Sequence, residues 1–240
     1  MRNLLSFCCL TIMTLALVVG TGYTAEEAES DSLKILVYGA TGKVGRHVVD
    51  EALNRGHIVT AVSRDSSRIT QIHDNLSAVQ GDILNPESVA SLVADQDVVI
   101  ISVRGIVGKS KDPNDTVPLI GAEKVVIALR DIGYGAPRLI HVGGSGSLEV
   151  EPGVLYADKL PKVFLPKSLE LEIAGQVLAL EYLRTVTDVG WSYATPAKNF
   201  TNGKLDGEAC AFISHPVAGV WAFQTLLFPS SSHNISSVSS

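Results

Sequence analysis

Residues 33–45, LKILVYGATGKVG, join a short apolar run to a turn that contains three glycines. The run from Leu33 to Tyr38 is rich in aliphatic and β-branched residues, which is typical of a buried strand. Apolar residues then recur at helical spacing from Val44 to Leu53, and Gly56 follows where a helix would stop. The segment therefore predicts a strand, a tight glycine turn and a helix in direct succession.

The rest of the chain repeats this alternation of strand and helix. Further strands are expected over residues 57–62, 76–80, 97–103, 138–142 and 191–194, and further helices over residues 86–93, 116–132 and 168–185. Asn85, just before Pro86, is expected to cap the first of these helices. Each expected strand is a continuous apolar run, as in a parallel sheet covered on both faces. The sequence thus predicts a doubly wound α/β sheet in a single domain.

Composition and charge exclude several classes of protein. The chain has 240 residues, of which 46% are apolar and 18% charged, so it is able to bury a substantial core. The formal net charge is -6 and no Lys/Arg cluster exceeds two residues, so no nucleic-acid-binding surface is expected. The six histidines have no metal-ligand spacing, and the mature chain keeps one cysteine, Cys210. Neither a metal site nor a disulfide is therefore expected.

The first 25 residues have the pattern of an export leader. Arg2 is the only charge before Glu26, and the apolar run over residues 4–19 is shorter than the ~20 residues of a typical spanning helix. Residues 1–25 are predicted to be a signal peptide that directs the protein to the periplasm or the exterior. The alternative is an uncleaved anchor, which would be the protein's sole membrane contact. An acidic spacer (26–32), the folded domain (33–228) and a disordered Ser-rich tail (229–240) are expected to follow.

The glycine turn has the composition of a phosphate-binding loop. Gly39 permits the tight turn, Gly42 lets a diphosphate approach the backbone, and Gly45 lets the helix pack closely on the strand. Free N–H groups and the positive end of the helix dipole would face the phosphates. The alternative is a structural turn without a cofactor. The residues expected to hold a dinucleotide here are Gly39, Thr41, Gly42, Lys43, Val44 and Gly45.

The end of the second strand distinguishes NAD from NADP. A carboxylate at this point binds the ribose 2′-hydroxyl of NAD, whereas a cation is needed for the 2′-phosphate of NADP. Residues 61–65 read AVSRD, which puts Arg64 at the expected place, with Ser63 able to add a hydrogen bond and Asp65 able to cap the next turn. NADP is therefore expected to be favoured over NAD. The alternative is that Arg64 is a solvated loop residue.

On these residues the chain resembles the atypical short-chain dehydrogenase/reductase superfamily, most closely its NmrA-like and flavin-reductase-like NAD(P)-binding proteins. The likeness covers residues 33–203 and includes the spacing of the three glycines, Gly81-Asp82, and residues 142–148, VGGSGSL. The resemblance implies a Rossmann-type fold and contacts of Asp82 and Ile83 with the adenine. The other cofactor contacts that it implies are Ser102 and Val103, and, at the nicotinamide end, Gly143, Gly144, Ser145 and Pro196.

Two departures from that superfamily bear on catalysis. Members that oxidise alcohols carry Tyr-x-x-x-Lys at the start of the helix after the fifth strand. Here Tyr156 and Lys159 are one residue too close together and lie in an expected loop, and the helix over 168–185 begins without a tyrosine. The second departure is the stretch over residues 215–228, which is apolar and expected to be helical, so the substrate lobe is expected to differ. No catalytic residue is assigned, and Ser145 and Tyr156 are the candidates.

Several other side chains are expected to be structural. His141 is expected to pack inside its strand, with an acid/base role as the alternative, and Trp191 and Tyr193 are expected in the core. The glutamates of the 168–185 helix, Glu172 among them, are expected on a solvated face.

The resemblance and the absent Tyr-x-x-x-Lys pair favour an NAD(P)H-dependent oxidoreductase of flavin-reductase type. Hydride would pass from the nicotinamide to a flat small-molecule acceptor such as a flavin, which mainly requires that the two rings be held face to face. The alternatives are a non-catalytic NADP-binding regulatory or assembly protein of NmrA-like type, and a sugar-nucleotide epimerase-like enzyme, which the missing tyrosine disfavours.

Overall fold

The computed structural model of the chain describes residues 32–161, 163, 165–196 and 211–215, and these belong to one compact unit that begins at Ser32. The predictions of a leader, of a Ser-rich tail and of a helix beyond residue 215 lie outside the described residues, as does Cys210. Within the described residues no helix is both long enough and apolar enough to cross a membrane.

Seven strands form one sheet in the order β3-β2-β1-β4-β5-β8-β9. The first six in this order are parallel, and β9 is antiparallel to β8. This sheet confirms the predicted doubly wound α/β fold, with the strand order reversing between β1 and β4. The strands are β1 Lys34–Tyr38, β2 Ile58–Ser63, β3 Leu76–Gln80, β4 Val98–Ile101, β5 Arg138–Val142, β8 Trp191–Thr195 and β9 Ala211–His215.

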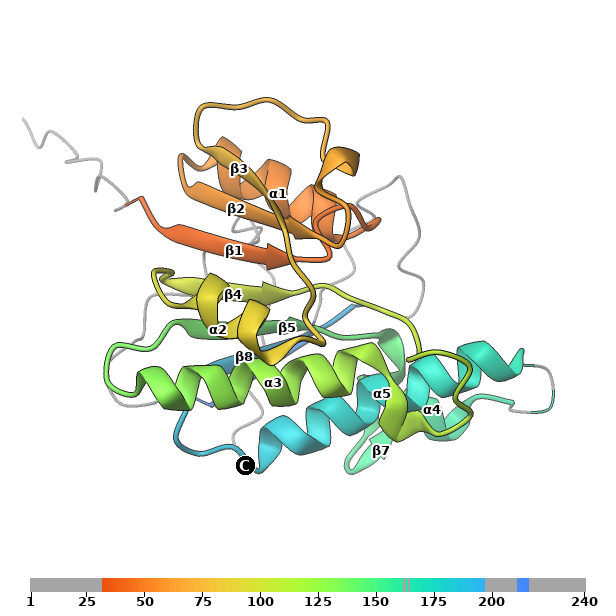
Figure 1. The fold of residues 1–240 in the computed structure, drawn as a ribbon. Helices are drawn as coiled ribbons and strands as arrows, with labels where there is room; N and C mark the ends of the chain where they lie inside the picture. The colour runs from red at the N-terminus through yellow and green to blue at the C-terminus, as the bar shows by residue number, and fades with distance from the viewer. Residues whose placement is uncertain (1–31, 162, 164, 197–210, 216–240) are drawn as a thin grey trace, which may run out of the picture. The chain divides into compact units, whose positions relative to one another are not determined.

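The helices cover the two faces of the sheet, with α1 on one face and α2, α3 and α5 on the other (Figure 1). Alternate residues of β1 face opposite ways, so Val37 packs with α1 whereas Leu36 packs with the other helices. Burial on both faces explains why the central strands are continuous apolar runs. The helices are α1 Gly45–Asn54, α2 Pro86–Val93, α3 Val117–Ile132, α4 Tyr156–Lys159 and α5 Lys167–Arg184.

The predicted cap of α2 is confirmed. The Asn85 side chain accepts a hydrogen bond from the Ser88 N–H at 2.8 Å, and Pro86 occupies the first turn, where its missing N–H costs nothing.

Three local predictions were wrong. The segment at Tyr156–Lys159 is a single helical turn, α4, because the Asp158 carboxylate accepts from the Leu155 N–H at 3.1 Å and stabilises its start. The strand β9 over residues 211–215 was not predicted; it pairs with the edge of β8, so His215 lies in a strand, and residues 216–228 of the expected helix lie outside the described residues. The fourth strand ends at Ile101, and the chain leaves the sheet before Val103.

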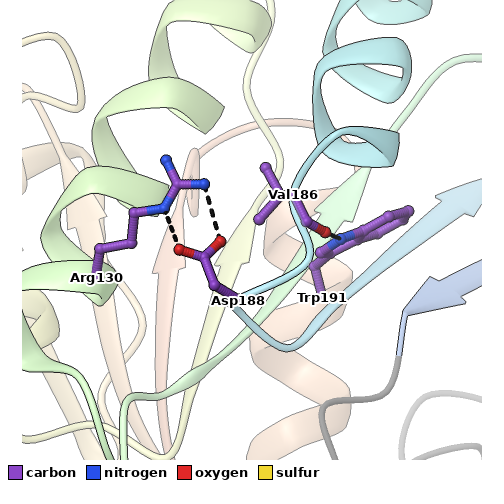
Figure 2. A network of polar contacts seen from close by, with 4 residues as sticks. All are labelled: Arg130, Val186, Asp188 and Trp191. Carbon is purple, nitrogen blue, oxygen red and sulfur yellow. Dashed lines mark hydrogen bonds and ion pairs between the residues drawn. The ribbon is translucent and has the colours of Figure 1, made fainter.

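The connection between α5 and β8 is held by side-chain contacts at the amino end of β8. Figure 2 shows Arg130 of α3 contacting Asp188 through two nitrogens, at 2.7 and 2.9 Å, while the Trp191 indole N–H donates to the Val186 carbonyl at 3.0 Å. The ion pair is largely exposed to solvent, so its contribution to stability is small. These contacts lie at the opposite end of β8 from the loops that follow the parallel strands.

Candidate functional site

The loops that carry the predicted site residues meet at one edge of the sheet. Figure 1 shows the arrowheads of β1, β2 and β4 pointing the same way, as parallel pairing requires. The carboxyl ends of parallel strands form one edge, and ligands of such sheets bind where the strand order reverses. The segments that follow the strands there are residues 39–45 after β1, 63–65 after β2, 81–83 after β3, 102–103 after β4, 143–145 after β5 and Pro196 after β8.

The glycine turn packs directly on the end of β4, and its glycines are needed for that contact. Gly39 has a φ of +79°, a left-handed conformation, and a β-carbon there would overlap the carbonyl oxygen of Ser102. A β-carbon on Gly45 would overlap the carbonyl oxygen of Gly39, and the Gly42 N–H donates to that same oxygen at 2.9 Å. The turn is therefore a backbone cradle that leaves no room for side chains at these two positions.

The amino end of α1 opens on this cradle. Val44 precedes the helix and makes no side-chain capping bond, and the first turn contains no acidic residue. The N–H groups in the first turn of a helix have no intrahelical partner and carry the positive end of the dipole. The N–H groups of Arg46 and His47 already donate to the carbonyls of Gly42 and Val44, at 3.2 and 3.0 Å, so an anion here would be bound by the amides of residues 43–45.

Arg64 lies at the end of β2 with its neighbours engaged elsewhere. The Asp65 carboxylate accepts from the Ser67 N–H at 3.1 Å and from the Ser67 hydroxyl at 2.6 Å, and these bonds lower the pKa of Asp65. Asp65 therefore caps the following turn, as predicted. The Ser63 hydroxyl accepts from the Asp65 N–H at 3.3 Å, and Arg64 itself is exposed.

A cavity of about 350 Å³ opens beside Arg64, between the ends of β2 and β3 and the start of α2. Asp82 is fixed in it, because its carboxylate accepts from the Leu84 N–H at 3.0 Å and its N–H donates to the Ser88 hydroxyl at 3.2 Å. The side chain of Ile83 is buried in the core against Gly121 of α3. The lining residues are Arg64, Gln80, Gly81, Asp82, Asn85 and Ser88.

Gln80, Asn85 and Ser88 were not predicted as site residues. Asn85 and Ser88 were recognisable only as the start of a helix, and a single glutamine at the end of a strand has no distinctive pattern.

At the other end of the edge, α5 places a polar network beneath the turn after β5. His141 stacks on Tyr193 with ring centres 5.1 Å apart, and its Nε2 lies 3.2 Å from Oε1 of Gln176. The Tyr193 hydroxyl donates to the Gln176 carbonyl at 2.8 Å and lies 3.0 Å from the Ser147 hydroxyl. A β-carbon on Gly143 would overlap the Tyr193 ring. The expected burial of His141 and Tyr193 is confirmed, but both belong to a hydrogen-bonded network.

The burial of His141 makes the free energy of unfolding depend on pH. It lowers the pKa of His141 to about 4, whereas an unfolded histidine titrates near pH 6.5. Between these values the unfolded chain binds more protons than the folded one, so the free energy of unfolding falls as the pH falls. We expect a loss of about 3 kcal/mol between pH 7 and pH 4 from this residue.

Urea titrations of the wild type and of His141→Phe, which keeps an aromatic ring against Tyr193, isolate this contribution. The variant should lose less stability than the wild type over the same pH range. Parallel losses in the two proteins would contradict the assignment.

The candidate catalytic hydroxyls lie on adjoining segments. Ser145 begins the 3-10 helix η3 (Ser145–Ser147), and Tyr156 begins α4. The Tyr156 N–H donates to the Leu148 carbonyl at 2.7 Å, and a β-carbon on Gly146 would lie 3.6 Å from that of Ala157. Both residues are half-buried. η3 and α4 therefore pack together, which keeps both hydroxyls as candidates.

The helix α5 presents Glu172 and Gln176 to the ends of β4 and β5. The Glu172 carboxylate accepts at 2.6 Å from Arg104, the residue directly after Val103. Its side chain is 24% exposed, so Glu172 lies on a partly solvated face, where it pairs with the exposed Arg104. Within the described ranges no group of three His, Cys, Asp or Glu side chains is placed to hold a metal ion.

These features fit a dinucleotide. Three features follow one another along this edge of the sheet. They are a backbone cradle that β-carbons would fill, a helix start without a side-chain cap, and a cavity lined by a cation and a fixed carboxylate. The adenosine half would lie at the cavity beside Arg64, and the nicotinamide half toward the turn after β5.

Comparison with known proteins agrees with this geometry. The family model described as NAD(P)H-binding matches residues 39–211. A solved structure of a candidate epimerase from Bacteroides thetaiotaomicron is 26% identical, with 74% of this chain and 76% of that chain covered and a TM-score of 0.62. A candidate exported protein from Burkholderia pseudomallei is 32% identical, with 73% and 78% covered and a TM-score of 0.58. A candidate NADH-flavin reductase from Streptococcus pneumoniae is 26% identical, with 73% and 78% covered and a TM-score of 0.56.

Proposed function

The chain belongs to the NAD(P)H-binding family, within the atypical short-chain dehydrogenase/reductases, and from this premise we propose that it is an NADPH-dependent reductase of flavin-reductase type. The observation that carries the proposal is the glycine cradle packed on β4 at the reversal of strand order, with Arg64 beside the adjoining cavity.

Each part of the edge has a role in holding the cofactor. Backbone amides of residues 39–45 would bind the pyrophosphate, which the amino end of α1 stabilises. Arg64 and Ser63 would bind the 2′-phosphate, and Asp82 the adenine. The residues that would border the nicotinamide are Ser102, Val103, Gly143, Gly144, Ser145 and Pro196. Bound there, the reduced cofactor supplies a hydride.

A flat acceptor suits the other groups at this edge. α5 carries no Tyr-x-x-x-Lys pair, so the tyrosine that protonates an alkoxide in alcohol dehydrogenases has no counterpart on this helix. Hydride transfer to a flavin mainly needs the two rings to be held face to face. Similarity to a candidate NADH-flavin reductase supports this choice of acceptor. Ser145 and Tyr156 are the side chains proposed to border the acceptor.

We also propose that the protein is exported. The leader-like residues 1–25 and the 32% identity to a candidate exported protein support this proposal. On this view residues 1–25 are removed, residues 26–32 are a spacer, residues 33–228 form the binding domain, and residues 229–240 are a tail.

The proposal predicts NADPH oxidation in the presence of a flavin. Purified protein should oxidise NADPH faster with FMN or riboflavin than without an acceptor, as followed by the loss of nicotinamide absorbance under anaerobic conditions. Quinones provide a second series of flat acceptors. Tight NADPH binding with no oxidation above background for any acceptor would instead identify a non-catalytic NADP-binding protein.

A further inference from the structure

One side chain of α5, that of Gln176, connects the ends of the two strands that border the proposed nicotinamide pocket. Its Oε1 lies 3.2 Å from Nε2 of His141 on β5, and its Nε2 donates a long hydrogen bond of 3.5 Å to the Val103 carbonyl after β4. A β-carbon on Gly144 would lie 3.6 Å from Cγ of Gln176, so the side chain also supports the turn after β5 from below.

The bonds around Gln176 have a definite direction. Since Oε1 accepts hydrogen bonds, His141 must donate through Nε2, which assigns the tautomer of a neutral ring. The Tyr193 hydroxyl donates to the Gln176 carbonyl at 2.8 Å and is left to accept from Ser147, at 3.0 Å. The turn after β5, the loop after β4 and the helix α5 are thus held in one arrangement.

A polar residue at this position needs an explanation. Gln176 is half-buried, and a neutral hydrogen bond there contributes little net stability because it replaces a hydrogen bond with water. Gln176 instead holds two backbone segments, at Val103 and Gly143–Gly144, that would lie on either side of a nicotinamide ring. The cavity beside Arg64, where the adenosine would lie, is at the other end of the edge, beyond β1 and between the ends of β2 and β3.

We propose that Gln176 is a positioning residue that fixes the spacing between Val103 and the turn after β5, and thereby the orientation of the nicotinamide ring. It acts through backbone groups and needs no contact with the reacting atoms. The inference rests on the proposed function, because it assumes that a nicotinamide lies between these segments. Displacing the ring by about 1 Å would slow hydride transfer by up to about 100-fold.

The test compares Gln176→Leu with wild-type protein by three measurements. Calorimetry should give an unchanged dissociation constant for NADPH, within about twofold, because the adenosine half and the pyrophosphate provide most of the binding. The fluorescence lifetime of bound NADPH should shift toward that of free NADPH, because the ring is held less firmly. With a flavin as acceptor, kcat should fall by about 10- to 100-fold.

Two further variants control for folding. Gln176→Glu keeps an acceptor for His141 but loses the N–H donated to Val103, so it should show the same pattern even if Gln176→Leu fails to fold. Glu181→Gln, on the exposed face of the same helix, should behave as wild type in all three measurements.

The outcomes separate the inference from the proposed function. An unchanged lifetime and an unchanged kcat in a folded Gln176 variant would overturn the positioning role. So would a rise in the dissociation constant as large as the fall in kcat. Wild-type protein that binds NADPH but reduces no acceptor would overturn the proposed reductase activity, while the lifetime comparison would still decide the role of Gln176 toward the ring.

Discussion

Gly39→Ala is expected to abolish measurable NADPH binding and to lower the free energy of unfolding by about 3 kcal/mol. Two effects combine at this position. The φ of +79° is unfavourable for any residue with a β-carbon, and that β-carbon would overlap the Ser102 carbonyl oxygen. The turn has to move away from β4 to accept the methyl group. The amides that would bind a pyrophosphate move with it.

Gly56→Ala is the matched control for this experiment. Gly56 has nearly the same φ, +80°, but a β-carbon there would meet no atom within 4 Å. The Gly56→Ala variant should lose only the part of the free energy of unfolding that comes from backbone conformation, about 1 kcal/mol, and should keep the wild-type affinity for the cofactor. Urea unfolding and calorimetry on both variants separate backbone strain from overlap. Equal stability and equal affinity in the two variants would show that the contact between Gly39 and β4 does not shape the site.

Much of the fold could be predicted because its information is local. The strands β1 to β5 and β8 are short apolar runs bounded by glycines and polar residues, and α2 begins with a cap and a proline. The strand β9 could not be predicted in this way. It pairs with β8 across some fifteen intervening residues, so its presence depends on an exposed sheet edge and not on its own composition.

The same difference between local signals and long-range contacts applies to the residues of the candidate site. The glycine turn and Arg64 occupy fixed places relative to their own strands, so their positions could be inferred from spacing. Gln176 could not be found in this way, because a single glutamine in a helix has no periodic signal. Its role depends on α5 packing against β4 and β5, which brings residues 73 and 35 positions apart into contact.

Arg64→Ala is expected to raise the dissociation constant of NADPH by about 30- to 100-fold and that of NADH by less than twofold. A guanidinium that binds a phosphate contributes about 1.5–3 kcal/mol, and each 1.4 kcal/mol corresponds to about tenfold in affinity. NADH lacks the 2′-phosphate and so loses no such contact. Because Arg64 is exposed, the variant should fold normally.

Arg130→Ala is a suitable control for the loss of a positive charge. Arg130 pairs with Asp188 beside the amino end of β8 (Figure 2), so its removal should leave the affinity for both dinucleotides unchanged. If Arg64→Ala weakened NADPH and NADH equally, the residue would contribute to the site in general and not to recognition of the 2′-phosphate.

Calorimetric titration of the folded wild-type protein with NADPH and then with NADH tests the central claim most directly. If the cradle over residues 39–45 binds a pyrophosphate and Arg64 binds the additional phosphate, both titrations should saturate at one site per chain. NADPH should then bind more tightly than NADH. A folded protein that gives no binding heat with either dinucleotide would contradict the account.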